Sequence, residues 1–127
     1  MSVKENKAFI RRIYDQLNQG DTNAFFNACA PGYIEHLTDR DINLEQSKEF
    51  EDKWLKESTN LNATINDMVA EGDKVVVLVT WRWIEKSTGK KFEMTNANIF
   101  RIAGGKCAEL WNVTDIRLAQ QLGALSK

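Results

Sequence analysis

The spacing of apolar residues changes once along the chain, near residue 62, and this change constrains the fold more than any other feature. Before it, apolar residues recur every three or four positions, as in amphipathic helices; after it, apolar and polar residues alternate, as in strands. Helices followed by consecutive strands predict an α+β domain, with helices covering one face of an antiparallel sheet. A length of 127 residues fits a single domain over residues 1–127.

Two helices are predicted in the first thirty or so residues. The first begins at Ser2, which forms the capping-box pattern with Glu5, and it ends at Gly20. The second covers residues 22–30 and closes at the Pro-Gly pair that follows.

A third helix follows a short extended piece, residues 33–37. Asn43 can cap this helix, with Gln46 as its capping-box partner. Phe50 and Trp54 are four residues apart, so they share one face of the helix, which we expect to point inward.

The second half of the chain predicts an antiparallel meander and a closing helix. The strands are expected at residues 63–71, 74–86, 91–102 and 106–114, and the helix at 115–125. Gly104 and Gly105 suit a two-residue turn, whose positive φ angles glycine adopts freely, so Ala103 should pair with Lys106.

Counting outward from this turn assigns a face to each residue of the last hairpin, because directly opposed residues share a face. One face would carry Met94, Asn96, Asn98 and Phe100 beside Glu109, Trp111, Val113 and Asp115. An apolar face with a few polar groups is typical of a ligand pocket. The alternative is that the two asparagines lie near a sheet edge or bond to a loop. In this register Arg101 and Glu109 lie on opposite faces.

Composition and charge exclude several classes of function. The net charge is −1, so neither nucleic acid nor an anionic membrane is an expected partner. The chain has no apolar run long enough to span a membrane and no signal-peptide pattern at its start, so we expect a cytoplasmic protein. The chain has two cysteines, Cys29 and Cys107, and one histidine, and their spacing does not match that of a metal site. We therefore expect no metal site, and we expect both cysteines to be buried thiols.

Three stretches together resemble the SnoaL-like polyketide cyclases of the nuclear transport factor 2-like superfamily. They are IRRIYDQLNQGD, APGYIEHL and NIFRIAGGKCAELWNVTD followed by LAQQLGAL, and they extend over nearly the whole chain. The resemblance implies a cone-shaped fold: a curved antiparallel sheet wrapped around three N-terminal helices, with an internal pocket. It also implies a homodimer formed through the sheets.

The resemblance also implies positions for chemistry. In the related ketosteroid isomerases a carboxylate after the second helix removes a proton next to a carbonyl, and that position looks like His36. In the same isomerases, an acid just before an FRF stretch donates a hydrogen bond to the resulting oxyanion. That position looks like Asn98, which precedes Ile99, Phe100 and Arg101. In the cyclases an aspartate near the end of the last strand is the acid/base group, and it looks like Asp115. The isomerases place an oxyanion-hole tyrosine where this chain has Ile13, with Tyr14 one residue later.

Each catalytic candidate has a structural alternative. Histidine titrates near neutral pH and suits a general base, but His36 could be an exposed loop residue. Asn98 is a neutral hydrogen-bond donor, but it could instead lie near a sheet edge or bond to a loop. Asp115 precedes the predicted last helix, where aspartate is also a good N-cap. The expected substrate-binding residues are Tyr14, Trp81, Asn96, Phe100 and Trp111.

The leading hypothesis is a small cofactor-independent enzyme. It would use acid/base chemistry on an apolar, carbonyl-bearing small molecule, as an aldol cyclase, isomerase or hydratase. The alternative is a module of the same fold that binds a small ligand, or dimerises, without catalysis.

Overall fold

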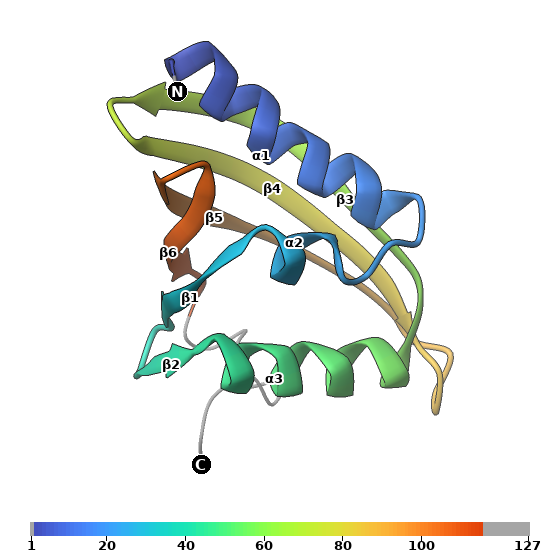
Figure 1. The fold of residues 1–127 in the computed structure, drawn as a ribbon. Helices are drawn as coiled ribbons and strands as arrows, with labels where there is room; N and C mark the ends of the chain where they lie inside the picture. Colours follow the sequence, from blue (N-terminus) through green and yellow to red (C-terminus); the bar gives the residue numbers. More distant parts are fainter. Residues whose placement is uncertain (1, 116–127) are drawn as a thin grey trace.

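In the computed structural model, which describes residues 2–115, three helices flank a curved, unclosed six-stranded sheet, and the first two of its strands precede the third helix (Figure 1). The helices are α1 (Val3–Asn18), α2 (Ala24–Asn27) and α3 (Leu44–Glu57). The strands are β1 (Cys29–His36), β2 (Asp41–Asn43), β3 (Ser58–Glu71), β4 (Lys74–Glu85), β5 (Lys91–Ala103) and β6 (Lys106–Val113). The predicted α+β cone is confirmed. The predicted closing helix lies outside the described residues.

Local capping fixes the starts of the two long helices. Ser2 Oγ accepts a hydrogen bond from the backbone N–H of Glu5 at 3.1 Å, and the Glu5 side chain accepts from the N–H of Ser2 at 2.9 Å. Asn43 and Gln46 make the same reciprocal pair at the start of α3, both at 2.9 Å. Both predicted capping boxes are confirmed, and each cap stabilises its helix by about 1 kcal/mol.

The second helix is shorter than predicted. It ends at Asn27, and β1 already begins at Cys29, so Pro31 and Gly32 lie within a strand. Proline has no N–H to donate to a sheet. The pairing of β1 with β6 shifts register between Cys29 and Ile34, and this irregular stretch accommodates both residues.

The sheet has the strand order β2-β1-β6-β5-β4-β3. Strands β3 to β6 form the predicted antiparallel meander, but β1 runs parallel to β6, so the sheet is mixed. This pairing brings the extended piece after α2 beside the last strand (Figure 1). Strand β1 therefore lies between β6 on one side and β2, which leads into α3, on the other.

The predicted register of the last hairpin is right at the turn and wrong beyond it. Ala103 pairs with Lys106, and Gly104 and Gly105 have φ angles of 59° and 74°. A β-bulge then follows, because Arg101 pairs with Glu109 while Ile102 pairs with Cys107. A one-residue shift moves every later side chain of β6 to the other face of the sheet.

The helices cover the inner face of the sheet at two places. Helix α1 packs on β3 and β4, and α3 contacts β1, β2 and β3 (Figure 1). The most fully buried large side chains are Tyr33, Ile10, Val75, Val77, Val79 and Cys107. Within residues 2–115, no helix is long and apolar enough to cross a membrane.

Candidate functional site

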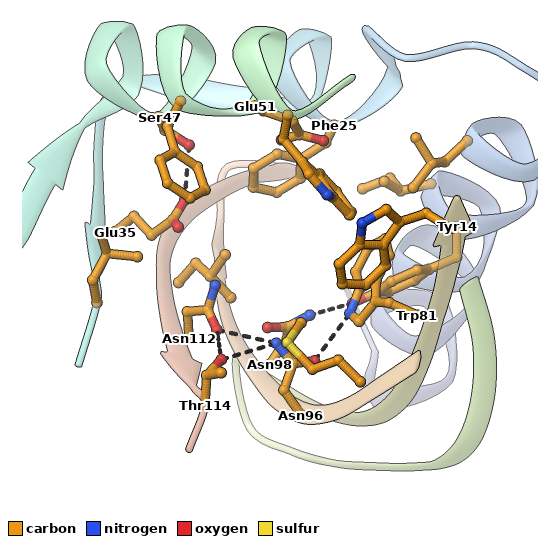
Figure 2. Close-up of a pocket in the computed structure, with 18 of the residues that line it drawn as sticks. Tyr14, Phe25, Glu35, Ser47, Glu51, Trp81, Asn96, Asn98, Asn112 and Thr114 are labelled. Atoms are coloured by element: carbon orange, nitrogen blue, oxygen red, sulfur yellow. Dashed lines mark hydrogen bonds between the residues drawn. The ribbon is translucent and has the colours of Figure 1, made fainter. Parts of the chain in front are cut away.

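A cavity of about 330 Å³ lies between α3 and the inner face of the sheet (Figure 2). Most of its wall is apolar or aromatic: Ile13, Leu17, Phe25, Leu37, Phe50, Trp54, Trp81, Trp83, Met94, Phe100 and Leu110. This volume is at the lower end of the ~300–1,000 Å³ typical of small-molecule pockets, which combine apolar walls with a few placed polar groups. Here the polar groups gather on two sides of the cavity.

The first polar side is acidic and comes from β1 and α3. Glu35 is only 6% exposed, and its Oε1 accepts hydrogen bonds from Tyr33 O–H and Ser47 Oγ–H, both at 2.8 Å. A buried carboxylate without such partners would be strongly destabilising. Among the contacts of residues 2–115, Oε2 of Glu35 has no hydrogen-bond partner, which leaves that atom for a ligand.

Glu51 is the second carboxyl group of this side. It lies one turn after Ser47 on α3 and lines the same cavity (Figure 2). Burial raises the pKa of Glu51 to about 8, and the negative charge of Glu35 adds to the rise. Glu51 is therefore mostly protonated at neutral pH and can act as a proton donor.

The second polar side comes from α1 and the sheet. The Asn98 side-chain amide donates a hydrogen bond to the Tyr14 hydroxyl at 2.8 Å, and both residues are nearly fully buried. Burial is the main cause that raises the pKa of Tyr14, so the phenol stays neutral. Helix α1 thus places the Tyr14 hydroxyl in the wall of the cavity, beside Asn98.

A network of side chains supports Asn96 beside this pair. Trp81 Nε1 donates to Asn96 Oδ1 at 3.0 Å, and Asn96 Nδ2 donates to Asn112 Oδ1 at 3.1 Å and to Thr114 Oγ1 at 3.2 Å (Figure 2). The hydrogen-bonding groups of Asn96 therefore have partners within the protein. This network holds the wall of the cavity in place, and a ligand would have to break it to bond Asn96 directly.

The outer face of the sheet carries a separate charged cluster. His36 is hydrogen-bonded to two carboxylates: its Nδ1 lies 2.7 Å from Asp41 Oδ1, and its Nε2 contacts Glu109 Oε2. Arg101 Nε donates to the other oxygen of Glu109, Oε1, at 2.8 Å. The hydrogen bonds to Glu109 and then Asp41 raise the pKa of His36, and those from His36 and then Arg101 lower the pKa of Glu109. The ring of Trp111 stacks on His36, with centroids 5.0 Å apart.

The sequence of the chain matches one family over most of its length. The profile of the SnoaL-like polyketide cyclases matches residues 8–122. This chain belongs to the SnoaL-like polyketide cyclase family. No curated protein matches it in sequence.

Solved structures of this SnoaL-like fold resemble the chain closely in shape. AclR of Streptomyces galilaeus, a proposed hydroxylase, has a TM-score of 0.86 at 22% identity, over 98% of this chain and 100% of its own. IdmH of Streptomyces antibioticus, a proposed polyketide cyclase, has a TM-score of 0.76 at 24% identity, over 93% and 98%. TsrD of Streptomyces laurentii has a TM-score of 0.78 at 24% identity, over 98% and 99%. At these identities the likeness shows the fold.

The structure brings together five of the eight site residues expected from the sequence. Tyr14, Trp81, Asn96, Asn98 and Phe100 all line the cavity of this SnoaL-like domain. Although Tyr14 is one residue past the tyrosine position implied by the resemblance, its hydroxyl still lies inside, against Asn98.

Three expected site residues lie elsewhere. The bulge turns Trp111 to the outer face, and the alternation of β1 turns His36 there too, so neither lines the cavity. The prediction that Arg101 and Glu109 lie on opposite faces is wrong, because they pair directly. Asp115 is exposed and is not among the cavity residues, and its capping role depends on residues outside the described range.

Sequence reasoning missed the acidic side of the cavity. Glu35 precedes His36, and strict alternation in YIEH would have assigned the inward position to Glu35 once buried Tyr33 was placed. Ser47 lies three residues before Phe50, and Glu51 lies three residues before Trp54; both aromatic residues were expected to face inward. That spacing was a usable signal that these polar side chains share the inner face of α3.

Proposed function

We propose that this SnoaL-like protein is an acid/base enzyme that enolises an apolar, carbonyl-bearing small molecule and thereby promotes an aldol cyclisation or a related isomerisation. The observation that carries the proposal is the pair Glu35 and Glu51 on one wall of a largely apolar cavity. Pairs of carboxyl groups in different protonation states are a common acid/base arrangement. Enolisation and aldol closure need no oxidant or reductant, so the proposal includes no metal and no cofactor.

Each group has a defined part in the proposed step. Glu35 takes a proton from the carbon next to the carbonyl, and the C–H electron pair becomes the enol double bond. Glu51, protonated because its pKa is about 8, gives its proton to the carbonyl oxygen. In an aldol closure the enol carbon attacks a second carbonyl of the same molecule. Glu35 then returns its proton to the new alkoxide, and the enol O–H returns one to Glu51.

The positions of the carboxyl groups support this assignment over His36. Within residues 2–115, Oε2 of Glu35 has no hydrogen-bond partner, whereas both ring nitrogens of His36 are already hydrogen-bonded to carboxylates on the outer face. The hydrogen bonds to Glu109 and then Asp41 also raise the pKa of His36, which favours its protonated form, and an imidazolium cannot accept a proton. We therefore assign the base to Glu35.

Proton exchange gives a direct test that needs no knowledge of the natural substrate. The probe is 2-tetralone in D₂O, with deuterium incorporation next to the carbonyl followed by NMR. The proposal expects faster exchange with the protein than with buffer, and Glu35→Gln to lower the catalysed rate by about 10²-fold or more. The matched control is Glu49→Gln on the exposed side of α3. Exchange that is equal with wild type and Glu35→Gln would leave a binding module as the better description.

We further propose that the chain forms a homodimer through the outer face of its sheet. Four of the large exposed apolar side chains lie on this face: Ile34, Val69, Leu78 and Val113. They occupy strands from both halves of the sheet, so the apolar surface is spread over one face. Burying such a surface against a second copy is favourable by about 25 cal/mol per Å² of apolar area.

A further inference from the structure

Within residues 2–115, no cation pairs with the buried carboxyl group of Glu35. Its partners in the sheet, Ile42 of β2 and Leu110 of β6, are both apolar. In the described part of the chain, the hydroxyl groups of Tyr33 and Ser47 are its only hydrogen-bond donors. An ionised carboxylate at this depth would depend on these two donors, because nothing else in the protein offsets the loss of its hydration.

Both hydroxyl groups donate to the same oxygen atom, Oε1 of Glu35. The hydroxyl oxygens of Tyr33 and Ser47 each lie 2.8 Å from it, and Figure 2 shows Ser47 reaching it from α3. Hydrogen bonds donated to a carboxylate favour its ionised form. Because neither bond uses Oε2, that atom can take up a proton while both bonds to Oε1 remain. Proton transfer therefore requires no rearrangement of the donors.

The two donors are held in place by the elements that carry them. Tyr33 is buried on β1, and its ring packs edge-on against that of Phe25, with centroids 5.5 Å apart. Burial raises the pKa of the Tyr33 phenol well above its usual range, so the phenol keeps the hydrogen that it donates. Ser47 is buried on α3, one turn before Glu51. Helix α3 therefore carries both a donor to Glu35 and the second carboxyl group of the cavity.

Glu51 has no comparable support. Within residues 2–115 no donor bonds its carboxyl group, and burial, followed by the charges of Glu35 and Asp52, raises its pKa to about 8. Tyr33 on β1 and Glu51 on α3 are the titratable groups that face Glu35. When two nearby carboxyl groups compete for one proton, the proton resides on the group whose ionised form is less stabilised. The two hydroxyl donors thus separate the protonation states of the pair.

We infer that Tyr33 and Ser47 are positioning residues of this site, because they hold Glu35 ionised and leave its second oxygen for the substrate. The proton shared by the two carboxyl groups then resides on Glu51. This inference deepens the proposed function and rests on it for the reaction, but the location of the proton is measurable without a substrate. Without the two donors, the proton should move toward Glu35 and the separation of base from acid should be lost.

Carboxyl carbon NMR locates the proton directly. Protein labelled with ¹³C at the glutamate side-chain carboxyl is titrated between pH 5 and pH 9, and the two resonances are assigned by their loss in Glu35→Gln and Glu51→Gln. In the wild type at pH 7 we expect an ionised Glu35 and a protonated Glu51. In the double variant Tyr33→Phe with Ser47→Ala, the Glu35 resonance should titrate at higher pH, and the Glu51 resonance at lower pH, than in the wild type.

Proton exchange of 2-tetralone tests the same donors in the reaction. Ser47→Ala should lower the catalysed rate by about tenfold at pH 6 and by less at pH 8, because a less stabilised carboxylate is protonated first at low pH. Ser47→Thr keeps a hydroxyl group and should preserve most of the rate. The matched control is Ser58→Ala, which removes a buried serine hydroxyl at the other end of α3, outside the cavity, and should keep the wild-type pH profile.

Three outcomes would overturn the inference. A wild-type protein with Glu35 protonated and Glu51 ionised at pH 7 would reverse the assignment. Unchanged titration of Glu35 in a folded double variant would mean that the hydroxyl groups do not hold its charge. A rate that Ser47→Ala lowers equally at pH 6 and pH 8 would mean that Ser47 only supports packing.

Folding of each variant is verified by circular dichroism, and the wild-type titration stands as the test if a variant fails to fold. The acid/base proposal fails separately. It is refuted if 2-tetralone exchange is equal with wild type and Glu35→Gln, whatever the carboxyl titrations show.

Discussion

Glu35 and Glu51 approach one cavity from β1 and α3, and the charge of the first helps to raise the pKa of the second to about 8. The main cause is the burial of Glu51, which disfavours its charged form. A carboxyl group held protonated at neutral pH makes folding depend on pH. It also makes the protein less stable than a neutral side chain would, which is common for residues that serve chemistry.

The first prediction concerns Glu51 and pH. The unfolded chain ionises Glu51 near pH 4.5 and the folded protein only near pH 8, so the folded state must hold a proton between these values. Stability from this group is therefore present below pH 4.5 and is lost as pH rises toward 8. Because the side chain is half-buried, we expect Glu51→Gln to raise the free energy of unfolding by about 1–2 kcal/mol at pH 8.

Urea unfolding at pH 5 and pH 8 measures this difference. The gain in the free energy of unfolding from Glu51→Gln should be smaller at pH 5. At that pH the folded protein keeps Glu51 protonated, so no ionised carboxylate is buried. Glu49→Gln, on the exposed side of α3, should show no such dependence. An equal change at both pH values would argue that Glu51 is not held protonated by the fold.

The second prediction concerns the outer cluster. Hydrogen bonds to Glu109 and Asp41 raise the pKa of His36, so this residue contributes stability that is full below its unfolded pKa and is lost as pH rises through the folded one. His36→Gln should therefore destabilise the protein more at pH 6 than at pH 9. Because His36 lies outside the cavity, proton exchange of 2-tetralone should continue in the variant.

The measurement is chemical unfolding of wild type and His36→Gln at the two pH values. Two cationic side chains also face the cluster: Lys74, whose ammonium lies 5.5 Å from the centre of the Trp111 ring, and Arg101, which donates to Glu109. Destabilisation that is the same at pH 6 and pH 9 would contradict a charged His36. Loss of exchange in a folded His36→Gln would instead restore its predicted catalytic role.

The parts of this protein that are encoded locally could be predicted from its sequence. Ser2 with Glu5 and Asn43 with Gln46 each start a helix through contacts within four residues, and the two glycines of the last turn fix Ala103 opposite Lys106. The alternation of apolar residues was enough to place Asn98 and Phe100 inside.

The rest depends on contacts between distant segments. The bulge in β6 is set by how the strand fits β1 and β5, and nothing in its own residues marks the shift that pairs Arg101 with Glu109. The pKa of Glu51 likewise depends on Glu35 from another element. A period-two pattern gives the faces of a strand only until the first irregularity, which is why Trp111 was assigned to the wrong face.

The third prediction concerns assembly. Leu78 is 43% exposed on the outer face of the sheet, between buried Val77 and Val79, so a lysine there should break a homodimer formed through this face. Sedimentation of wild type is expected to give a dimer, and Leu78→Lys a monomer with the same circular dichroism. Val3→Lys on α1 changes a similarly exposed valine and should remain dimeric. A monomeric wild type would refute the dimer proposal.

The last prediction concerns how α1 is fixed to the sheet. Asn18, at the end of α1, donates to the carbonyl of Ala63 and accepts from its N–H, both at 2.8 Å. Asn18 thus satisfies both backbone groups of a residue buried in β3. Asn18→Ala would leave that donor and acceptor unpaired, so we expect a loss of about 1–3 kcal/mol in the free energy of unfolding.

Asn23 provides the matched control for this clamp. It is exposed, and as the residue preceding α2 its side chain makes no capping hydrogen bond, so Asn23→Ala should change stability by no more than about 0.5 kcal/mol. Because α1 carries Tyr14 into the cavity, loosening the helix should also slow the catalysed proton exchange of 2-tetralone. An Asn18→Ala protein as stable as the Asn23 variant would show that packing alone holds α1 on β3.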